Sequence, residues 1–366
     1  MHIVHTEASC GWGGQEIRIL SEAAGMIERG HQVTLLCPEQ ARIFAAAQAR
    51  KIPVCALPIA DKGLRGMLAL RRWLQSHKTD VVNTHSSTDS WLAALACRLL
   101  RSAPPLVRTR HISAPLPPNW ATRWLYVRAT QHVVTTGEKL REDLTRTLDC
   151  APEHVTSIPT GVDTALYAPG DKLATRHRLG LPQQRLLIGI VATLRSWKGH
   201  LYLIDAFAKL RGDAAALVIV GDGPMKPNIV ARVEQLKLGS RVIMPGNRDD
   251  VSAWLQALDI FALPSYANEG VPQALVQAML SGLPCVTTNA GAIGEAAIAD
   301  KTALVVARKD VEGLRAALQV LIDDPAWRTR LGTAARAHCT KRFSREAMLD
   351  RMEAVFYNAL ASKMPH

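Results

Sequence analysis

The sequence predicts an α/β protein with two doubly wound, Rossmann-like domains, each built on a parallel sheet. Short apolar runs alternate with helical patterns along the chain, which is typical of βα units. At 366 residues the chain is long enough for two domains with separate cores. Residues 158–182, rich in proline and glycine, divide the runs into two groups, as a linker between two sheets does. We therefore expect two domains with a cleft between them.

Each short apolar run predicts one strand. We expect strands at residues 3–6, 33–37, 54–57, 81–84, 106–110, 133–135 and 155–158 in the first half, and at 186–191, 216–220, 242–244, 260–263, 285–288 and 303–306 in the second. Helical patterns lie between them, for instance at residues 16–29, 64–76, 91–100, 201–210 and 311–322. A further helical pattern at residues 345–361 follows the last strand. The predicted domains are residues 1–160, to which helix 345–361 returns, and residues 161–344.

The composition is that of a globular protein. Apolar residues make up 48% of the sequence, and no run approaches the roughly 18 consecutive apolar residues that span a bilayer. Residues 1–5 open directly into a strand and lack the regions of a signal peptide. The seven cysteines are scattered without a Cys-x-x-Cys pair, which favours reduced thiols over zinc. We expect a cytoplasmic protein.

Positive charge is concentrated in one quarter of the chain. The net charge is +12, and residues 41–130 contain 14 Lys or Arg against three acids, an excess of +11. Such a segment attracts phosphorylated substrates, anionic lipid or nucleic acid through the same long-range field. The alternative for any single arginine of this segment is that it faces solvent and binds no partner. Nucleic acid is disfavoured because neither a recognised motif nor an aromatic platform accompanies the charge.

A glycine-rich turn follows the first strand and opens the first helix. Gly13 and Gly14 lie in this turn, where a phosphate or a sugar could approach the backbone and the positive end of the helix dipole. The dinucleotide fingerprint Gly-x-Gly-x-x-Gly is absent. A tight turn without a ligand is the alternative. A second glycine turn, with Gly221 and Gly223, follows a strand of the second domain and could by itself be an ordinary βα turn.

Two cations follow the first strand of the second domain. Arg195 and Lys198 are three residues apart, so both can point to one side of the turn that begins the next helix. Two cations at a helix N-terminus complement a diphosphate. The alternative is a pair of basic residues that face solvent.

The segment 269–279 places one acid beside the start of a helix. Gly270 and Val271 follow Glu269 and offer backbone N–H groups. Pro272 suits the first helical position, because its missing N–H would be unpaired there, and Gln277 lies farther along the helix. Such a site suits an anion next to hydroxyl groups, as in a sugar nucleotide.

Two neighbouring strands of the first domain end in basic residues. His85 ends one strand, and Arg108, Arg110 and His111 end the next. The carboxyl ends of parallel strands face the ligand crevice in doubly wound folds. The arginines and His111 therefore form a candidate site for an acceptor or a phosphate. A structural role is the alternative for a lone histidine such as His85.

Together these motifs resemble those of retaining glycosyltransferases with the GT-B fold, in particular family 4, which includes bacterial lipopolysaccharide and glycolipid glycosyltransferases. The resemblance covers nearly the whole chain and is most specific in the second domain. It implies that Arg195 and Lys198 hold the donor pyrophosphate and stabilise charge on the leaving phosphate. It also implies that His85 contacts the donor sugar, and that the last helix crosses back to the first domain.

The family pattern also assigns roles around Glu269. It has two glutamates separated by seven residues, and this sequence has Glu269 at the first position and Gln277 at the second. Glu269 is expected to meet the transferred sugar, and Gln277 the ribose, with weaker hydrogen bonds than a carboxylate would make. The resemblance adds Glu295 and the four glycines 13, 14, 221 and 223 to the donor site.

We therefore expect a glycosyltransferase that moves a sugar from a UDP- or GDP-sugar to a lipid-linked or anionic glycan, in lipopolysaccharide or other cell-envelope polysaccharide biosynthesis. No Asp-x-Asp occurs, so we expect neither a metal nor another cofactor. The resemblance implies retention of anomeric configuration. A sugar-nucleotide epimerase of the same fold is the alternative enzyme, and a nucleotide-sugar-binding subunit with weak turnover is the alternative that Gln277 favours.

Two basic amphipathic patterns suggest association with an anionic inner-leaflet surface. In residues 64–74, Leu64, Met67, Leu68 and Leu74 share a face, with arginines elsewhere. The second pattern, at residues 119–128, places Trp120, Trp124 and Val127 on one helix face, with two arginines interleaved. The alternative is that each apolar stripe packs against its own domain.

Overall fold

The computed structural model of the protein describes residues 1–111, 116–267 and 269–362, which form two compact units. Unit 1 comprises Met1–Gly161 and the C-terminal segment that begins at Arg345, and unit 2 comprises Val162–Ser344. The predicted boundary after residue 160 lies one residue from this division.

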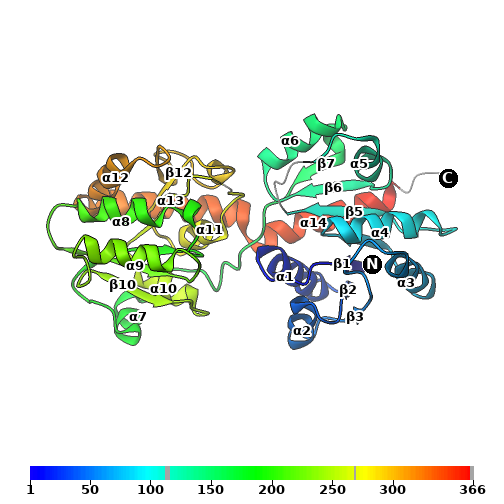
Figure 1. The fold of residues 1–366 in the computed structure, drawn as a ribbon, viewed down its shortest axis with the longest axis horizontal. Coiled ribbons are helices and arrows are strands. Elements are labelled where there is room, and N and C mark those ends of the chain that lie inside the picture. Colours follow the sequence, from blue (N-terminus) through cyan, green and yellow to red (C-terminus); the bar gives the residue numbers. More distant parts are fainter. Residues whose placement is uncertain (112–115, 268, 363–366) are drawn as a thin grey trace. The chain divides into compact units, whose positions relative to one another are not determined.

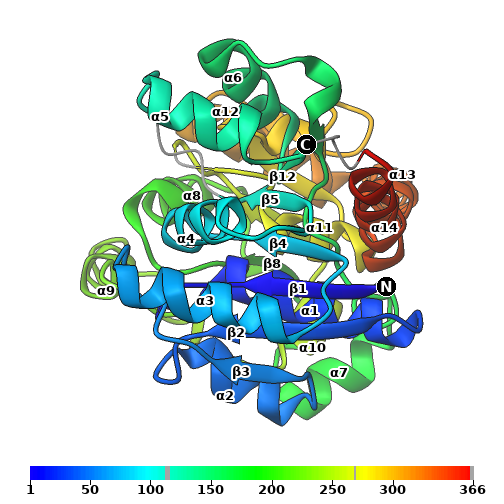
Figure 2. The ribbon, with the colours of Figure 1, turned by 90° about the vertical axis from the view of Figure 1, so that its right-hand side faces the viewer.

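Unit 1 is built on a seven-stranded parallel sheet with strand order β3-β2-β1-β4-β5-β6-β7. Figure 2 shows β3, β2, β1, β4 and β5 side by side. The strands are β1 (His2–Thr6), β2 (Gln32–Cys37), β3 (Val54–Ala56), β4 (Val81–Thr84), β5 (Leu106–Arg110), β6 (His132–Thr135) and β7 (Val155–Ser157). The order reverses at β1, which pairs with β2 on one side and with β4 on the other.

Helices cover both faces of this sheet. They are α1 (Gly14–Glu28), α2 (Arg42–Ala49), α3 (Leu64–Ser76), α4 (Ser87–Arg98), α5 (Trp120–Arg123), the π-helical turn η1 (Trp124–Arg128), α6 (Glu138–Leu148), the short turn η2 (Pro152–His154) and α14 (Arg345–Ala361). Successive strand side chains point to opposite faces. Accordingly, Ile3 packs with α1, α2 and α14, whereas Val4 packs with α3, α4 and α6.

Unit 2 repeats the plan with six parallel strands in the order β10-β9-β8-β11-β12-β13. The strands are β8 (Leu186–Val191), β9 (Ala215–Val220), β10 (Val242–Gly246), β11 (Ile260–Leu263), β12 (Cys285–Thr288) and β13 (Leu304–Val306). Its helices are α7 (Lys172–Leu179), η3 (Ser196–Lys198), α8 (His200–Ala208), α9 (Lys226–Gln235), α10 (Val251–Ala257), α11 (Gln273–Leu280), η4 (Ile293–Glu295), α12 (Val311–Asp323) and α13 (Pro325–Phe343). The order reverses at β8, which pairs with β9 and β11.

The predicted fold of two parallel sheets is confirmed, and every predicted strand is present with small shifts of its ends. The start of α4 was predicted four residues too late, because Ser86 and Asp89 form a capping box that begins the helix at Ser87. Pro272 was predicted as a first helical residue. Instead its backbone is extended and it precedes α11, which begins at Gln273.

The last helix, α14, packs against α1 in unit 1 (Figure 1). Arg29, at the end of α1, donates hydrogen bonds to Asp350 at 2.7 Å and to Glu353 at 2.9 Å. His31 contacts Glu353 at 2.7 Å. Beneath them, the apolar side of α14 joins the core on the α1 face of the sheet. The helix therefore completes this core although it follows unit 2 in the sequence.

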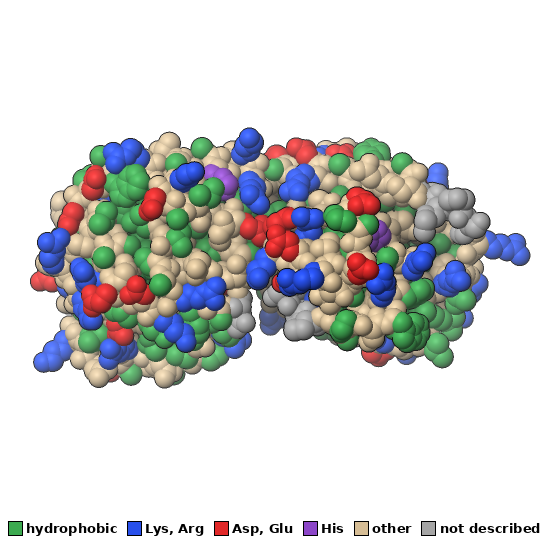
Figure 3. Space-filling model, turned by 90° about the horizontal axis from the view of Figure 1, so that it is seen from above, with side chains coloured by type: hydrophobic (Ala, Val, Ile, Leu, Met, Phe, Trp, Pro, Cys, Tyr) green, Lys and Arg blue, Asp and Glu red, His purple; other side chains and the backbone are tan. Residues whose placement is uncertain are grey.

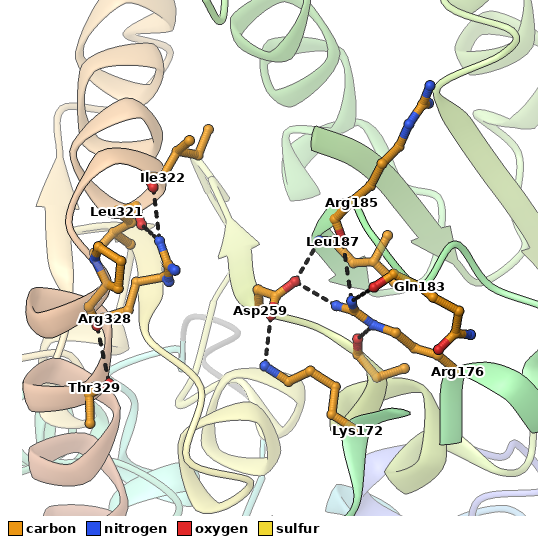
Figure 4. A network of polar contacts seen from close by, with 12 residues as sticks. Lys172, Arg176, Gln183, Arg185, Leu187, Asp259, Leu321, Ile322, Arg328 and Thr329 are labelled. Atoms are coloured by element: carbon orange, nitrogen blue, oxygen red, sulfur yellow. Dashed lines mark hydrogen bonds and ion pairs between the residues drawn. The ribbon is translucent and has the colours of Figure 1, made fainter. Parts of the chain in front are cut away.

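In unit 2, one buried acid ties α7 to two strands of the sheet (Figure 4). Asp259, just before β11, accepts hydrogen bonds from Lys172 Nζ at 2.7 Å, from Arg176 Nη2 at 2.5 Å and from the backbone N–H of Leu187 at 2.8 Å. Burial alone would raise the pKa of Asp259, but the hydrogen bonds and the two cations hold it below its usual value. The guanidinium of Arg176 is buried with it.

We expect Asp259→Ala to destabilise unit 2 by about 3 kcal/mol, because it leaves a buried guanidinium without its carboxylate. Lys172→Ala, which removes the partly exposed partner, should cost less than about 1 kcal/mol. The measurement is urea-dependent hydrogen exchange of the slowest amides in β8 and β11, which report the unfolding of this unit. Equal effects of the two substitutions would contradict the ranking.

Candidate active site

In unit 2, three polar residues meet where the strand order reverses. The loops after β8 and β11 begin side by side, at the position where doubly wound sheets bind ligands. Lys198, from the first loop, contacts Glu269 Oε1 in the second at 2.7 Å. Ser265 donates a hydrogen bond to the same oxygen at 2.7 Å. The carboxylate of Glu269 is almost fully buried, so this arrangement holds the Lys198 ammonium in a defined place.

An ammonium has three N–H donors. One is directed at Glu269, which leaves Lys198 the capacity to donate to an anion as well. Arg195 is in the same loop, and its guanidinium lies 5.8 Å from the centre of the Trp197 ring. The structure thus places the two predicted cations in one short loop at the reversal point and brings one of them onto the predicted acid. Their binding of a pyrophosphate stays a prediction.

The glycine turn after β9 packs against this loop. A Cβ on Gly221, whose φ is +140°, would lie 2.0 Å from the carbonyl oxygen of Ala192. A Cβ on Gly223 would lie 2.8 Å from the carbonyl oxygen of Leu194. The two glycines therefore have a packing role that the sequence did not predict: they allow the loop that carries Arg195 to lie directly on the turn. Their predicted contact with a donor remains untested by this arrangement.

A second loop supports the backbone of Glu269. Gly291 has φ of +57°, and a Cβ there would lie 1.9 Å from the carbonyl oxygen of Glu269. The N–H of Ala292 donates to the same carbonyl at 3.2 Å. Farther along, Glu295 lies 3.5 Å from Arg342 of α13, which was not predicted as its partner. The remaining predicted donor residues of unit 2 lie before or within α11: Gly270 and Val271 precede it, and Gln277 is in its second half.

In unit 1, a pocket of about 440 Å³ opens at the corresponding reversal point. It lies at the carboxyl ends of β1, β4 and β5 and at the N-termini of α1 and α4. Its lining residues are Ser9, Trp12, Gly13, Gly14, Gln15, Glu16, His85, Ser86, Ser87, Arg108, Arg110 and His111. The structure therefore brings together all six residues of unit 1 that the sequence singled out.

Two buried arginines give this pocket a positive wall. Arg108 is 4% exposed, and its guanidinium stacks 4.2 Å from the centre of the Tyr126 ring. Arg110 is also buried and donates to the Tyr126 hydroxyl at 2.9 Å. Among the residues that the structure describes, Nε and Nη1 of Arg108 have no hydrogen-bond partner. A buried guanidinium with unused donors at a pocket wall is suited to bind an anion.

Hydrogen bonds link three histidine rings at this pocket. His85 and His111 line the pocket, and His5 is buried behind them. His5 Nδ1 lies 2.9 Å from His85 Nε2, and His85 Nδ1 lies 3.0 Å from His111 Nε2. Burial lowers the pKa of His5 to about 3. Burial and the charge of Arg18 also lower the pKa of His85 and of His111 well below the usual value. All three rings are therefore neutral at physiological pH.

Two buried acids hold the loops at the pocket. Asp89 accepts hydrogen bonds from the Thr6 hydroxyl at 2.6 Å and from the backbone N–H groups of His85 and Ser86 at 2.9 and 2.8 Å. Glu7 accepts from the backbone N–H of Ser9 at 2.7 Å. Burial and the nearby Asp89 raise the pKa of Glu7 to about 8, so it carries its proton at neutral pH.

Sequence reasoning missed several residues that line this pocket or lie behind its wall. The hydroxyl residues at the start of α4 could have been found, because the pattern from Ser86 to Asp89 is a capping-box signal directly after a strand. Tyr126, which orients both arginines, carries no such signal because it lies in a π-helical turn. His5 was missed because its contact with His85 follows from the pairing of β1 with β4.

Comparison with known families identifies the chain. The Glycosyltransferase Family 4 model matches residues 12–166, and the Glycosyl transferases group 1 model matches residues 171–338. A D-inositol 3-phosphate glycosyltransferase of Corynebacterium aurimucosum is 30% identical over 78% of this chain and 73% of that protein. The chain belongs to glycosyltransferase family 4. It is a glycosyltransferase with the GT-B fold, as the sequence predicted.

Other relatives of this glycosyltransferase are also named as glycosyltransferases. A D-inositol 3-phosphate glycosyltransferase of Corynebacterium glutamicum is 28% identical over 96% of this chain and 93% of that protein. A UDP-Gal:alpha-D-GlcNAc-diphosphoundecaprenol alpha-1,3-galactosyltransferase of Escherichia coli is 29% identical over 62% of each chain. Among solved structures, a glycosyltransferase of Rickettsia africae has a TM-score of 0.89 at 18% identity, with 99% of each chain covered. Anabaena HepE in complex with UDP has a TM-score of 0.84 at 21% identity, with 98% of this chain and 100% of that chain covered. At these sequence identities, the structural similarity supports the fold alone.

The neutral histidine chain predicts a pH dependence of the glycosyltransferase's stability. Because the pKa of His5 is about 3 in the folded protein and 6.5 is its ordinary value, unfolding takes up a proton between these pH values. The stabilisation is present above pH 6.5 and is lost as the pH falls. Between pH 7.5 and 4.5, His5 alone should cost the folded state about 2.7 kcal/mol.

The matched variant is His5→Asn, which does not titrate in this range. Its free energy of unfolding should approach or exceed that of the wild type as the pH falls from 7.5 to 4.5. The two proteins are compared by urea unfolding at each pH. A difference that stays constant over this range would show that His5 does not titrate as inferred.

Proposed function

We propose that this glycosyltransferase moves a sugar from a UDP- or GDP-sugar to a lipid-linked or anionic glycan, with retention of configuration, in lipopolysaccharide or other cell-envelope polysaccharide biosynthesis. The observation that carries the proposal is the contact of Lys198 with Glu269 at the reversal point of the unit 2 sheet. Unit 2 then holds the donor and unit 1 holds the acceptor.

The residues of unit 2 match the chemistry of a sugar nucleotide. Lys198 and Arg195 provide two positive charges in one loop for a pyrophosphate, which is the group that gains charge as the glycosyl bond breaks. Glu269, held by Ser265, can accept hydrogen bonds from sugar hydroxyls once an anion competes for the ammonium. Anabaena HepE has been solved with UDP and with UDP-glucose, which supports a nucleotide-sugar partner. The two cations take the charge-stabilising role that a divalent ion has in other transferases, so we propose that no metal or cofactor is required.

Replacing either cation tests this proposal. Arg195→Ala and Lys198→Ala should each lower kcat for sugar transfer by about 100-fold or more, because each removes charge stabilisation at the leaving phosphate. The control is Lys209→Ala, whose side chain is exposed on the surface of unit 2 and pairs with Glu312. The donor is first chosen by the thermal stabilisation that UDP, GDP and their sugars produce.

Unchanged transfer in the Arg195 or Lys198 variants would contradict the donor assignment. The same assay separates the rival functions. An epimerase would convert the sugar of the donor without any acceptor, and a binding subunit would be stabilised by the nucleotide without turnover.

The pocket of unit 1 supports an acceptor that carries phosphate. Among the described residues, Nε and Nη1 of Arg108 have no hydrogen-bond partner, and Arg110 lies beside Arg108 in the pocket wall. The N-termini of α1 and α4 open toward the same pocket and favour negative charge. The names of two relatives contain D-inositol 3-phosphate and GlcNAc-diphosphoundecaprenol. We therefore propose that Arg108, Arg110 and His111 bind a phosphate of the acceptor, and that Gly13, Gly14 and His85 face the donor sugar.

Arg108→Met should weaken binding of a phosphorylated acceptor by about 10- to 100-fold, because it removes charged hydrogen bonds in a buried site. Calorimetric titration with inositol phosphate and with inositol, in the presence of saturating UDP, compares the phosphorylated and unphosphorylated forms. The control is Arg101→Met, at an exposed position before β5. Equal affinity of the wild type for the two compounds would contradict an anionic acceptor site.

Two adjacent helices of unit 1 support a peripheral membrane association. Leu64 and Leu68 of α3 are exposed, at 75% for Leu64, and so are Leu95 and Leu99 at the end of α4. The helices pack together, and Arg71 of α3 donates to the carbonyl of Leu99. Three exposed cations lie on the same two helices: Arg65, Arg72 and Arg98. Apolar side chains among cations fit an anionic lipid surface.

In each of the two amphipathic patterns that the sequence suggested, some apolar side chains pack against the core and others are exposed. In α3, Leu74 packs in the core whereas Leu64 and Leu68 do not. At residues 119–128, Trp120 is 83% exposed, whereas Trp124 packs against the core. Figure 3 shows Lys and Arg side chains interspersed with acids on the face that it draws. Among the described residues, no helix is long and apolar enough to cross a membrane. We propose a cytoplasmic protein that binds the inner leaflet through α3 and α4.

The double substitution Leu64→Gln and Leu68→Gln should lower binding to vesicles rich in phosphatidylglycerol by about tenfold, because it removes apolar side chains that would enter the lipid interface. Leu173→Gln, at an exposed leucine of unit 2, is the control. Flotation of the protein with anionic and with neutral vesicles measures the bound fraction. Failure of the wild type to bind anionic vesicles would contradict the association.

A further inference from the structure

Two hydrogen bonds link the imidazole rings of His5, His85 and His111 into a row, which we call the histidine chain. The three rings come from the carboxyl ends of neighbouring strands β1, β4 and β5, and they lie 5.2 and 5.3 Å apart between ring centres. His85 and His111 line the pocket of unit 1, whereas His5 is buried behind them and does not. His5 also meets Phe356 of α14 edge to face, with 6.5 Å between ring centres. The first ring is thus fixed by the core on one side and by His85 on the other.

A neutral imidazole carries one proton, on Nδ1 or on Nε2. In each contact of the chain, one nitrogen must therefore be the donor and the other the acceptor. With three neutral rings, only two arrangements satisfy both contacts. In one, every ring is protonated on Nδ1, and His5 donates toward His85, which donates toward His111. In the other, every ring is protonated on Nε2 and the chain runs the opposite way.

The buried end of the chain distinguishes the two arrangements. Nε2 of His5 is inaccessible and has no hydrogen-bond partner among the described residues. The second arrangement would place an N–H there, and orphaned buried N–H groups are rarer in proteins than unsatisfied acceptors. The first arrangement leaves only a lone pair at that position. The Nδ1-protonated arrangement is therefore favoured.

We propose that His5 is a positioning residue that fixes His85 and His111 as Nδ1–H tautomers, so that the chain directs an N–H donor toward the pocket. The nitrogen of His111 that the chain does not use is Nδ1, and in this arrangement it carries the proton. A neutral donor beside Arg108 and Arg110 suits an oxygen of the acceptor phosphate or of a hydroxyl group. This functional part of the inference rests on the acceptor site proposed above.

The same geometry excludes a role as a proton relay that removes a proton from the acceptor. In the proposed arrangement His111 Nδ1 already carries a proton and has no lone pair with which to accept another. In the opposite arrangement, a proton accepted there could leave the chain only from His5 Nε2. That atom has no acceptor among the described residues, and the charge of Arg18 opposes a cationic ring at His85 or His111. The chain can orient a donor but has no site that would receive a transferred proton.

The test uses the full-length protein labelled with ¹⁵N-histidine, because imidazole nitrogen shifts report which nitrogen carries the proton. In the wild type, His5, His85 and His111 should all be Nδ1–H tautomers at neutral pH. His5→Asn should preserve this state at His85 and His111, since an Asn side-chain amide can occupy the position of the Nδ1 donor. His5→Phe keeps an aromatic ring but removes the donor, and should change the tautomer population of His85.

Activity provides the second readout. His5→Phe should lower kcat/KM for the acceptor by about tenfold, the equivalent of one hydrogen bond, mainly through KM, whereas His5→Asn should stay close to the wild type. Nε2–H tautomers at His85 and His111 in the wild type would overturn the proposal, as would an unchanged His85 tautomer in His5→Phe. If His5→Phe does not fold, the wild-type spectrum still decides the direction. Absence of transfer in the wild type would contradict the proposed function and leave the tautomer measurement valid.

Discussion

The parallel arrangement of the strands is the constraint on which the rest of this structure depends. A parallel strand needs a crossover to reach its neighbour, so helices cover both faces and the strand ends alone are left for chemistry. Where the strand order reverses, at β1 and β4 in unit 1 and at β8 and β11 in unit 2, two loops diverge and open a site. The pocket of unit 1 and the contact of Lys198 with Glu269 both lie at such a point.

The loops at these two points are held by close backbone packing in unit 2 and by buried hydrogen bonds in unit 1. Gly221 and Gly291 allow backbones to approach more closely than any side chain would permit, so the loops of unit 2 are fixed to each other. In unit 1, the acid Asp89 ties β1 to the start of α4. Side chains that are positioned before a substrate arrives need little reorganisation during the reaction, which is the condition for electrostatic catalysis.

The sequence predicted the sheets well because their signal is local. Most strands contain a short run of β-branched or leucine residues, and Pro and Gly mark the change from one unit to the other. Motifs directly after strands, such as Arg195 to Lys198, were found for the same reason. The contacts of Glu295 with Arg342 and of His5 with His85 join residues that are far apart in the chain. They depend on which strands and helices become neighbours, and a single sequence does not contain that information in a local pattern. The packing role of Gly221 was likewise hidden, because a glycine turn looks the same whether it faces a ligand or a second loop.

The most direct test of the account is a crystal structure of the protein with bound UDP or GDP, whichever stabilises it more. The account predicts the pyrophosphate at the reversal point of unit 2, within hydrogen-bonding distance of Lys198 Nζ and of the Arg195 guanidinium. A nucleotide bound elsewhere, or bound there with both cations directed away from its phosphates, would contradict it.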